Sequence, residues 1–364
     1  MNILFVSGHP AQIHNFKLVK KELESHGHKV FWLATDKDIS RYLLEKYNIK
    51  YSLLEKPQKS FLSKIRVLFL NTKYSTRFIK SNKIDIVVSR ISPYLALASF
   101  LLRKPHITLT DTESAGFYDR FFCKFTNALL TSSSFQKTLR SDQIRFNSNI
   151  ELFYLHPNRF KPLSKEDISR LLGINNEDQY VLMRFVGWDA FHDKGLYGFS
   201  EDNKLKAVNE FSKLCKIFIS AEKTLPDKLE PYRVKIPVEY MHDVLANAIM
   251  FFGESATMAT ESAVLGTPAV FLNQNWFGST GEAENYGLLF SYKEKPDDQI
   301  NAINKGIELL KIPHLKNKML LNNRKYLKDK IDITAFMVWF IENYPSSYNI
   351  MMKNPGYQIR FNKG

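Results

Sequence analysis

The sequence lacks the motifs by which several common enzyme classes are recognised. Its 364 residues contain no Gly-x-Gly-x-x-Gly fingerprint, no Walker-type phosphate loop and no Gly-x-Ser-x-Gly nucleophile elbow. These absences argue against a nicotinamide cofactor, a P-loop nucleotidase and an α/β-hydrolase. The two cysteines, Cys123 and Cys215, have no metal-ligand spacing. So few cysteines are typical of a protein of the reducing cytoplasm.

Long apolar runs are missing as well. After the first ten residues the most apolar run is 93–102, which lies between Arg90 and Arg103 and is too short to span a bilayer. The opening residues, MNILFVSGHP, lack the basic flank and long apolar core of a signal peptide. We therefore expect them to form a buried strand, and the protein to be soluble or peripheral.

Acidic residues are scarce in the first 150 residues, which hold 24 Lys and Arg against 11 Asp and Glu. The remainder is nearly balanced, and the whole chain carries a formal net charge of +14. Such an asymmetry indicates an anionic partner, which is nucleic acid, a polyanion, a lipid phosphate or an anionic membrane surface.

The strongest local excess of basic charge lies in residues 59–83, which hold seven basic residues and no acidic one. Four apolar residues repeat there at helical spacing along one face, namely Phe61, Ile65, Leu68 and Phe69. Either this face packs on the first sheet while the charges are solvated, or the segment meets anionic lipid.

Apolar runs of strand length alternate with amphipathic helices in both halves of the chain. The expected strands are 3–7, 29–34, 49–53, 85–89, 106–110, 128–131, 180–186, 216–220, 234–236, 248–252, 269–272 and 288–290. The expected helices are 12–26, 37–47, 61–80, 94–102, 205–215, 242–247, 255–265, 297–310, 315–328 and 333–343. Continuous apolar strands separated by helices predict parallel sheets that are covered on both faces.

The fold class that we expect is α/β, with two doubly wound Rossmann-like domains facing one cleft. The chain is 44% hydrophobic and long enough to bury two cores. The expected divisions are an N-terminal domain at 1–155, a linker at 156–178, a C-terminal domain at 179–345 and a tail at 346–364. Ligands in such sheets bind beyond the carboxyl ends of the strands, so the loops there are the places to look for a site.

The segment GESATMATESAVLGTPAVFLN, residues 253–273, predicts an anion site. A strand leads into a helix that opens at Ser255, Ala256 and Thr257, and Gly-Thr-Pro closes it. Such a helix start offers unpaired N–H groups and a positive dipole end. Glu261, nearly two turns further on, can reach a sugar hydroxyl. Alternatively, Ser255 is only an N-cap and Glu261 is solvated.

This segment resembles the donor-nucleotide segment of GT-B-type enzymes, which include many glycosyltransferases and the UDP-N-acetylglucosamine 2-epimerases. Those enzymes carry a small-residue turn for the diphosphate, a Glu for the ribose and a Leu-Gly-x-Pro close. The resemblance implies diphosphate binding at Ser255, Ala256 and Thr257 and ribose binding at Glu261. Five ordered blocks also resemble a family of unknown function described as epimerase-like or glycosyltransferase-like. These are GHPAQIHNF (8–16), DIVVSRISPYLA (85–96), LTDTESAG (109–116), RFVGWDAFHDKG (184–195) and residues 253–273.

Two histidines follow the first strand, in the loop GHPAQIH. A histidine with a pKa near ~6.5 can take a proton from an attacking hydroxyl. Otherwise His9 and His14 are a turn residue and a helix-start residue that bind water. In GT-B enzymes this loop lies on the acceptor side, so the resemblance implies that His14 is a catalytic base and that His9 binds substrate.

Two carboxylates, Asp111 and Glu113, follow the strand 106–110. They act as bases or bind sugar hydroxyls, or they cap a helix. The run Glu-Ser-Ala-Gly that starts at Glu113 loosely resembles the Glu-Ala-Gly run of the epimerases, whose Glu is catalytic. Both acids are therefore catalytic candidates. Arg90, after the preceding strand, meets a phosphate or pairs with one of these acids.

The second half offers further candidates for donor binding. Trp188, Asp189 and His192 form a dense polar and aromatic set after the strand 180–186. In the epimerases a histidine of the equivalent loop contacts the donor phosphates, so the resemblance implies this role for His192. Glu222 follows the next strand and lines the donor pocket by position.

Two more loops resemble donor-binding loops of GT-B enzymes. Met241 and His242 lie where those enzymes bind the base, and Glu282 lies in a Gly-rich loop comparable to the one that touches the donor sugar. No Asp-x-Asp pair stands in a loop where a metal-dependent transferase would hold its ion. Because a helix dipole with His and Arg can serve instead, we expect neither a metal nor another cofactor.

Together these features predict a glycosyltransferase that moves a sugar from a nucleotide-sugar donor, such as a UDP-sugar, to a glycan or lipid-linked acceptor of the cell envelope. Its expected place is the cytoplasm or the inner face of the cell membrane, where it would contact anionic lipid rather than nucleic acid. The alternative is a nucleotide-sugar 2-epimerase or hydrolase. The absence of their Gly-Thr-Arg-Pro-Glu run favours the transferase. A second alternative is a nucleotide-sugar-binding or nucleic-acid-binding protein without turnover.

Overall fold

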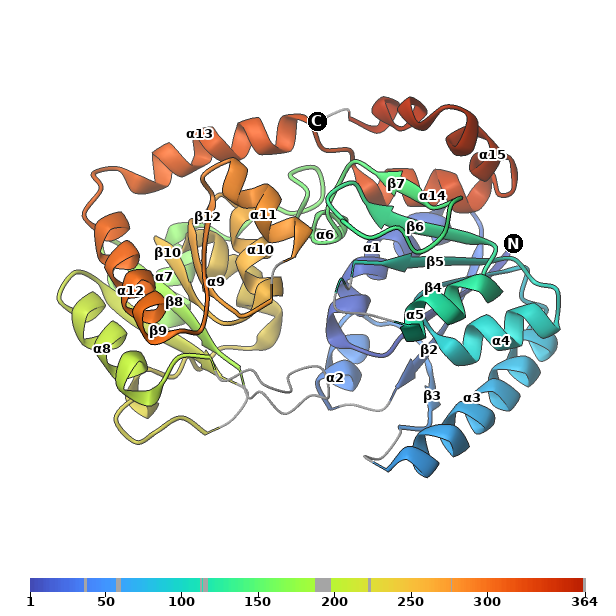
Figure 1. Cartoon of the computed structure of the whole chain (residues 1–364), viewed down its shortest axis with the longest axis horizontal. Coiled ribbons are helices and arrows are strands. Elements are labelled where there is room, and N and C mark those ends of the chain that lie inside the picture. The colour runs from blue at the N-terminus through green and yellow to red at the C-terminus, as the bar shows by residue number, and fades with distance from the viewer. Residues whose placement is uncertain are drawn as a thin grey trace. The chain divides into compact units, whose positions relative to one another are not determined.

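The chain forms two compact units in the computed structural model (Figure 1). Unit 1 consists of Met1–Tyr154 and Lys330–Gly364, and unit 2 consists of Leu155–Asp329. The residues that the structure describes are 1–35, 38–56, 60–111, 113, 117–186, 198–221, 224–275 and 277–362. Within these ranges no helix is both long enough and apolar enough to cross a bilayer.

Unit 1 is built on a seven-stranded parallel sheet in the order β3-β2-β1-β4-β5-β6-β7. Its strands are β1 (Asn2–Ser7), β2 (Lys29–Thr35), β3 (Ser52–Leu54), β4 (Ile86–Arg90), β5 (His106–Thr110), β6 (Ala128–Ser132) and β7 (Ile144–Phe146). Its helices are α1 (Pro10–Ser25), α2 (Asp38–Lys46), α3 (Phe61–Ser81), α4 (Pro93–Leu101), α5 (Phe117–Phe122), α14 (Ile333–Glu342) and α15 (Ser346–Lys353).

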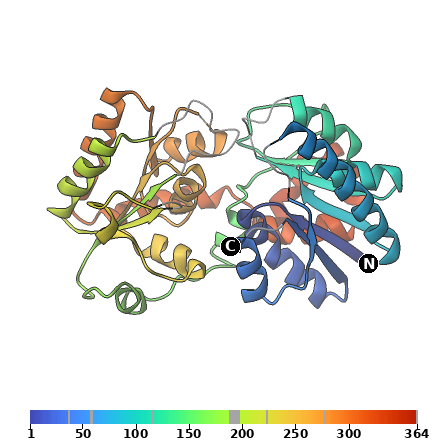
Figure 2. The same ribbon diagram turned by 90° about the horizontal axis from the view of Figure 1, so that it is seen from below.

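The centre of this sheet is completely buried. Phe5 of β1 pairs with Trp32 of β2 on one side and with Val88 of β4 on the other. All three side chains are at most 1% exposed. Helices cover both faces of the sheet (Figures 1 and 2), which is why its central strands are continuous apolar runs rather than alternating ones.

The end of the chain belongs to unit 1, which differs from the division that we expected. We placed residues 333–345 in the second domain and 346–364 in a tail, whereas α14 packs against α1. Its apolar sequence explains this return, because seven of its side chains are buried. They are Ile333, Thr334, Phe336, Met337, Val338, Phe340 and Ile341.

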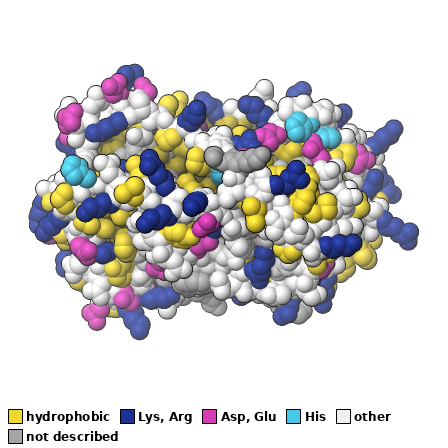
Figure 3. All heavy atoms as spheres, turned by 90° about the horizontal axis from the view of Figure 1, so that it is seen from above, with side chains coloured by type: hydrophobic (Ala, Val, Ile, Leu, Met, Phe, Trp, Pro, Cys, Tyr) yellow, Lys and Arg dark blue, Asp and Glu magenta, His cyan; other side chains and the backbone are white. Residues whose placement is uncertain are grey.

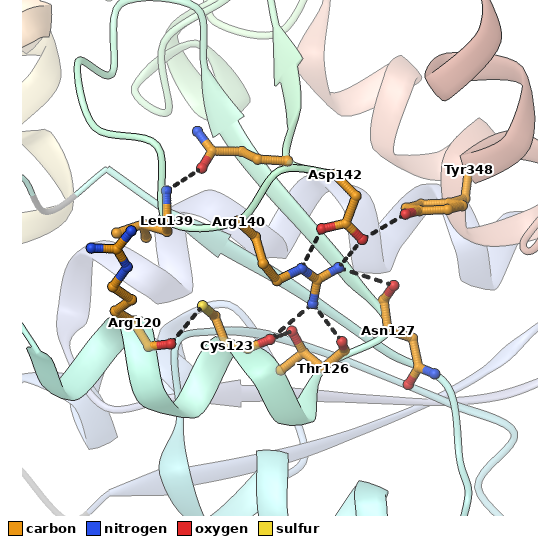
Figure 4. A network of polar contacts seen from close by, with 9 residues as sticks. Arg120, Cys123, Thr126, Asn127, Leu139, Arg140, Asp142 and Tyr348 are labelled. Atoms are coloured by element: carbon orange, nitrogen blue, oxygen red, sulfur yellow. Dashed lines mark hydrogen bonds and ion pairs between the residues drawn. The ribbon is translucent and has the colours of Figure 1, made fainter.

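A polar network fixes α15 to the same unit (Figure 4). The Arg140 guanidinium forms two hydrogen bonds with Asp142, at 2.6 and 2.7 Å, and donates to the carbonyls of Cys123 and Thr126. Tyr348 of α15 donates to Asp142 Oδ2, which also accepts from Arg140, at 2.7 Å. The hydrogen bonds from Arg140, which have the largest effect, and from Tyr348 hold the pKa of Asp142 below its usual range.

Unit 2 is built on a five-stranded parallel sheet in the order β12-β11-β10-β8-β9. Its strands are β8 (Tyr180–Phe185), β9 (Lys216–Ala221), β10 (Met250–Gly253), β11 (Ala269–Leu272) and β12 (Leu289–Tyr292). Its helices are α7 (Lys165–Leu172), α8 (Glu201–Ser212), α9 (Met241–Asn247), α10 (Ala256–Val264), α11 (Gly278–Asn285), α12 (Pro296–Leu310) and α13 (Leu315–Lys328), and the short α6 (Leu152–Leu155) joins the units. Two parallel sheets flanked by helices confirm the expected α/β class with two domains.

Two details of unit 2 differ from expectation. Residues 234–236 form no strand, and the nearest pairing is an isolated bridge between Ile219 and Arg233. The expected linker is folded into unit 2, because Leu163 is bonded to α9. Its N–H donates to Asp243 Oδ1 at 2.9 Å, and its carbonyl accepts from Asn247 Nδ2 at 3.1 Å.

Candidate functional site

The strand order of unit 2 reverses at β8, which creates the place where doubly wound sheets bind ligands. The chain passes from β8 to β9 on one side, and β10 lies on the other side of β8. Connections that run in opposite directions leave a crevice beyond the carboxyl ends of β8 and β10. Residues 254 and 255, which follow β10, therefore lie at this crevice.

The start of α10 has the features of an anion site. The N-cap residue Ser255 accepts a hydrogen bond from Met258 N through its Oγ, at 3.3 Å. Ala256 and Thr257 are the first helical residues, half-buried and exposed, and the first turn contains no acidic side chain. The leading N–H groups of a helix have no partner within it and carry its positive dipole end, so an anion is stabilised there.

Glu261 lies on the buried side of α10. The alternative interpretation of the sequence, in which Glu261 is solvated, is therefore wrong. Glu261 is 6% exposed, and its Oε1 lies 3.0 Å from Nε2 of His242 on α9. The ring of Phe160 lies edge-on to His242, with 6.4 Å between ring centroids. The structure thus brings Glu261 and His242, which are 19 positions apart in the sequence, into contact. The resemblance implies that Glu261 binds the ribose of the donor and that His242 lies beside its base.

Met241 and Glu282 lie at the same end of unit 2. Because α9 leads into the amino end of β10, its own first residues, Met241 and His242, lie toward the carboxyl edge of the sheet. Glu282 is half-buried in the second turn of α11, which follows β11 and so begins at that edge. Both α9 and α11 pack against α10.

Glu254 is a residue of this edge that the sequence analysis missed. It is 1% exposed, and its two carboxylate oxygens accept hydrogen bonds from Val186 N at 2.8 Å and from Phe199 N at 2.7 Å. Lys204 Nζ lies 3.6 Å away. Burial raises the pKa of Glu254, and the charge of Lys204 opposes that shift. Glu254 therefore holds both ends of the β8–α8 loop at the start of α10. The sequence did contain a signal for Glu254, namely an acidic residue between an apolar strand and an N-cap serine.

Glycine is required on both sides of α10. A Cβ on Gly253 would lie 2.4 Å from the Arg184 carbonyl oxygen, which accepts from Glu254 N. Gly266 has φ +72° and ends the helix, as the Leu-Gly-Thr-Pro sequence predicted. The Arg184 guanidinium donates to Ser220 Oγ at 2.8 Å, so the carboxyl ends of β8 and β9 are also joined.

Four residues that we assigned to donor binding lie outside the described residues. They are Trp188, Asp189, His192 and Glu222. Among the side chains that are described, no group of three or more His, Cys, Asp or Glu is placed to hold a metal ion.

The strand order of unit 1 also reverses, between β1 and β4. His9 lies in the loop that follows β1. His9 is the N-cap of α1, since its Nδ1 accepts from Ala11 N at 3.3 Å. The Gly8 N–H in turn donates to Gln12 Oε1 at 2.7 Å. These bonds place His9 in the turn before α1, as the alternative interpretation of His9 expected.

His14 lies in the second turn of α1 and is buried, with 9% exposure. Its ring packs against those of Tyr47 and Tyr154, with centroids 5.7 and 5.3 Å away. Its Nδ1 lies 3.3 Å from Lys17 Nζ. Because an ammonium group can only donate, Nδ1 accepts and Nε2 carries the hydrogen.

Arg90 and Asp111 form an ion pair, which is one of the two alternatives the sequence left open. Arg90 ends β4 and Asp111 follows β5, and these neighbouring parallel strands end at one edge. Burial lowers the pKa of Arg90 to about 10, while the negative charges of Glu151 and Asp119 oppose that shift. At neutral pH the guanidinium therefore stays charged.

Glu113 is buried, with 9% exposure, and holds a loop of unit 1. Its Oε1 accepts a hydrogen bond from the backbone N–H of Gln136, at 2.9 Å. A carboxylate can accept several hydrogen bonds at once. The bond to Gln136 therefore leaves room for other partners on the carboxylate, and the catalytic role that the resemblance implies for Glu113 stays a prediction.

No family model matches the chain, and no curated protein matches its sequence. Solved structures do resemble it in fold. The UDP-GlcNAc 2-epimerase from Neisseria meningitidis, solved with UDP-GlcNAc bound, superposes with a TM-score of 0.66 at 15% identity, over 94% of this chain and 100% of the epimerase.

Two further structures extend the similarity to other proteins. MurG from Acinetobacter baumannii has a TM-score of 0.59 at 16% identity, covering 94% of this chain and 99% of MurG. The spinosyn rhamnosyltransferase SpnG, complexed with spinosyn aglycone, also has a TM-score of 0.59, at 12% identity, covering 94% of this chain and 100% of SpnG. The chain therefore has the GT-B fold, with two α/β domains, which it shares with these three structures.

Proposed function

We propose that the protein is a GT-B glycosyltransferase that moves a sugar from a nucleoside-diphosphate donor to a glycan or lipid-linked acceptor. One observation carries the donor half of this proposal. A helix without acidic residues in its first turn starts at the strand-order reversal of unit 2, and a buried carboxylate held by His242 lies along the same helix.

In the proposed complex the diphosphate binds at Ser255 and the N–H groups after it, and Glu261 accepts a hydrogen bond from a ribose hydroxyl. Met241 and His242 lie beside the base, and Glu282 faces the sugar. Glu254 would act as a positioning residue, because it holds the loop that carries Trp188 and the other candidates there.

The transfer step needs a base and a stabilised leaving group. The base takes the proton of the acceptor hydroxyl, whose oxygen bonds to the anomeric carbon. The bond from that carbon to the diphosphate oxygen breaks, and the nucleoside diphosphate leaves with the electron pair. The dipole of α10 stabilises the growing negative charge without a metal ion. On unit 1, His14 or an acid of the pair Asp111 and Glu113 would serve as base, and His9 and Arg90 would bind the acceptor.

A nucleotide-sugar 2-epimerase or hydrolase is the second candidate. The fold similarity favours it, since the Neisseria epimerase superposes with a TM-score of 0.66, against 0.59 for MurG and for the rhamnosyltransferase. In that reaction Glu113 would be the catalytic acid or base, and no acceptor would be needed.

Calorimetry with a panel of nucleoside diphosphates tests the donor site first. Mass spectrometry of each nucleotide sugar, incubated with the protein with and without a membrane lipid extract, then separates the reactions. A product that forms only with the extract supports the transferase. An epimer or free sugar that forms without the extract supports the second candidate. Binding without turnover under either condition would overturn both.

Glu261→Gln should weaken nucleoside-diphosphate binding, whereas Glu177→Gln serves as the matched control. Glu177 is exposed and precedes β8, so it lies at the amino edge of the sheet, away from the crevice. Equal losses in both variants would show that general charge, and not this site, holds the nucleotide.

A further inference from the structure

The outward side of α3 begins with three exposed apolar side chains. Leu62 is 76% exposed, Ile65 50% and Phe69 67%. At 3.6 residues per turn these three positions fall on one side of the helix. The opposite side is buried and consists of Val67, Asn71, Ser75 and Ile79. Figures 1 and 2 show α3 on the outside of unit 1, beside α4.

This arrangement corrects one interpretation of residues 59–83. If the apolar face that we defined packed on the sheet, Ile65 and Phe69 would be buried, but both are exposed, and Leu68 is half-buried. Lys59 and the side chain of Phe61 lie outside what the structure describes. The other side of α3 is buried instead, and its Ile79 belongs to the core that contains Leu4 and Val87 of the sheet.

Basic residues continue the same outward side. By the helical period Lys73 and Lys80 follow Leu62 and Phe69 along the helix, with Arg66 and Arg77 close beside them. All four are exposed, and α3 contains no acidic residue. The exposed face therefore carries three apolar side chains and Arg66 in its first half, and the cations Lys73, Arg77 and Lys80 in its second half.

The α3 face combines exposed apolar and basic side chains, and the helix contains no acidic residue. On the face shown in Figure 3, Lys and Arg side chains are spread out with Asp and Glu between them. Exposed apolar residues that stand singly need no explanation, but three on one helix face mark a contact surface. Nucleic acid would neutralise the cations of α3 but would leave Leu62 and Phe69 in water. A bilayer offers anionic head groups and hydrocarbon side by side, which suits both halves.

We propose that α3 docks unit 1 on an anionic lipid bilayer. Leu62, Ile65 and Phe69 enter the boundary between head groups and acyl chains, and the cations that follow bind lipid phosphates. The inference deepens the proposed function, on which its purpose rests, since an enzyme with a lipid-linked acceptor has to work at a membrane surface. Docking itself requires neither nucleotide nor acceptor.

Sedimentation of the full-length protein with vesicles tests this directly. One set contains phosphatidylglycerol and phosphatidylcholine in equal parts, and the other contains phosphatidylcholine alone. We expect binding to the anionic vesicles that weakens as salt is raised, because exposed charges are screened, and little binding to the neutral ones. Equal binding to both sets, or binding to neither, would overturn the proposal.

Substitutions on α3 test whether this helix is the element that docks on the bilayer. Replacing Leu62, Ile65 and Phe69 together by Ser should lower partitioning by about tenfold or more, because the apolar insertion is lost. Their exposure means that the thermal midpoint should not fall. Leu101→Ser on α4 and Leu321→Ser on α13 are matched controls, since these leucines are 67% and 58% exposed.

Undiminished binding by the triple variant, or an equal loss in either control, would show that α3 is not the docking element. Calorimetry separates this result from the proposed function. The triple variant should bind nucleoside diphosphate as the parent protein does, so docking and donor binding can fail independently.

Discussion

His242 Nε2 lies 3.0 Å from Glu261 Oε1, and this contact joins the start of α9 to the middle of α10. Because a carboxylate can only accept, Nε2 must carry a hydrogen. The pair thereby fixes the orientation of both side chains: the imidazole presents Nδ1 on its other side, and the carboxylate stays in place along α10. Such a held carboxylate is suited to bind a sugar hydroxyl without reorganising.

The first prediction concerns this pair. Glu261→Ala should weaken binding of a nucleoside diphosphate by ~1.5–3 kcal/mol, because a hydrogen bond to a charged group is lost. It should also lower the thermal midpoint, since His242 is left without the carboxylate in a largely buried position. Calorimetry and thermal unfolding measure the two effects separately.

A double-mutant cycle tests whether the two residues act together. His242→Gln and Glu261→Gln should each weaken binding, and the double variant should lose less than the sum of the two losses, since contacting residues are coupled. Strict additivity would mean that the contact is not maintained in the nucleotide complex. Unchanged affinity in all three variants would remove the pair from the donor site.

Glu254 should matter for both stability and binding. In Glu254→Gln the amide nitrogen faces one of the two backbone N–H donors, so a buried donor loses its acceptor, at a cost of ~1–3 kcal/mol. We expect a lower thermal midpoint and weaker nucleotide binding, because the loop ends at Val186 and Phe199 are released from α10. The exposed Glu177→Gln is again the control. A variant with the parent midpoint would show that the carboxylate is not needed to hold the loop.

The fold could be predicted from the sequence where the signal is local. Strands β5 and β11 and helix α13 have the predicted ends, since apolar or amphipathic runs stop there at Pro, Gly or polar residues. The signal failed where periodicity is weak. Helix α11 has the small and polar sequence GSTGEAEN, and β7 has only three residues, so neither was expected.

The return of the chain to unit 1 could not be predicted in this way. The hydrophobic pattern of residues 333–342 predicts a buried helix correctly, but it does not say which sheet the helix covers. Position along the chain suggested the nearer domain, whereas contact with α1 and the Tyr348–Asp142 bond place this end in unit 1.

The same limit applies to the candidate site. The start of α10 could be predicted because capping residues and the helix dipole are local features of the sequence. The bonds of Glu254 to Val186 and Phe199 join residues 68 and 55 positions apart. The pairing of Arg90 with Asp111 was left open for the same reason, since it depends on which strands are neighbours.

Metal independence is a separate prediction. Activity in excess chelator should equal activity with added magnesium, because the α10 dipole would stabilise the leaving diphosphate. Product formation, followed by mass spectrometry under both conditions, is the measurement. Complete loss with chelator and recovery on adding metal would reveal a carboxylate ligand set that we have not recognised.

His106 provides a pH-dependent prediction for unit 1. It begins β5, is fully buried, and its Nε2 lies 2.9 Å from Ser89 Oγ on β4. Burial lowers the pKa of His106 from 6.5 to about 3. Between these values the unfolded chain binds a proton that the folded chain does not bind, so stability falls as pH is lowered through this window.

His106→Gln should therefore make unit 1 less sensitive to acid. The amide can still reach Ser89 but does not titrate. The variant therefore lacks the acid-induced loss of unfolding free energy that His106 causes, which is about 1.4 kcal/mol for each unit of pKa shift. Denaturant midpoints measured between pH 7 and pH 4 should fall less steeply than in the parent protein, even if the variant is less stable at pH 7. His314→Asn is the control, because this exposed histidine has a positive φ that asparagine tolerates. Parallel pH curves for the parent and His106→Gln would show that His106 takes up its proton in the folded state.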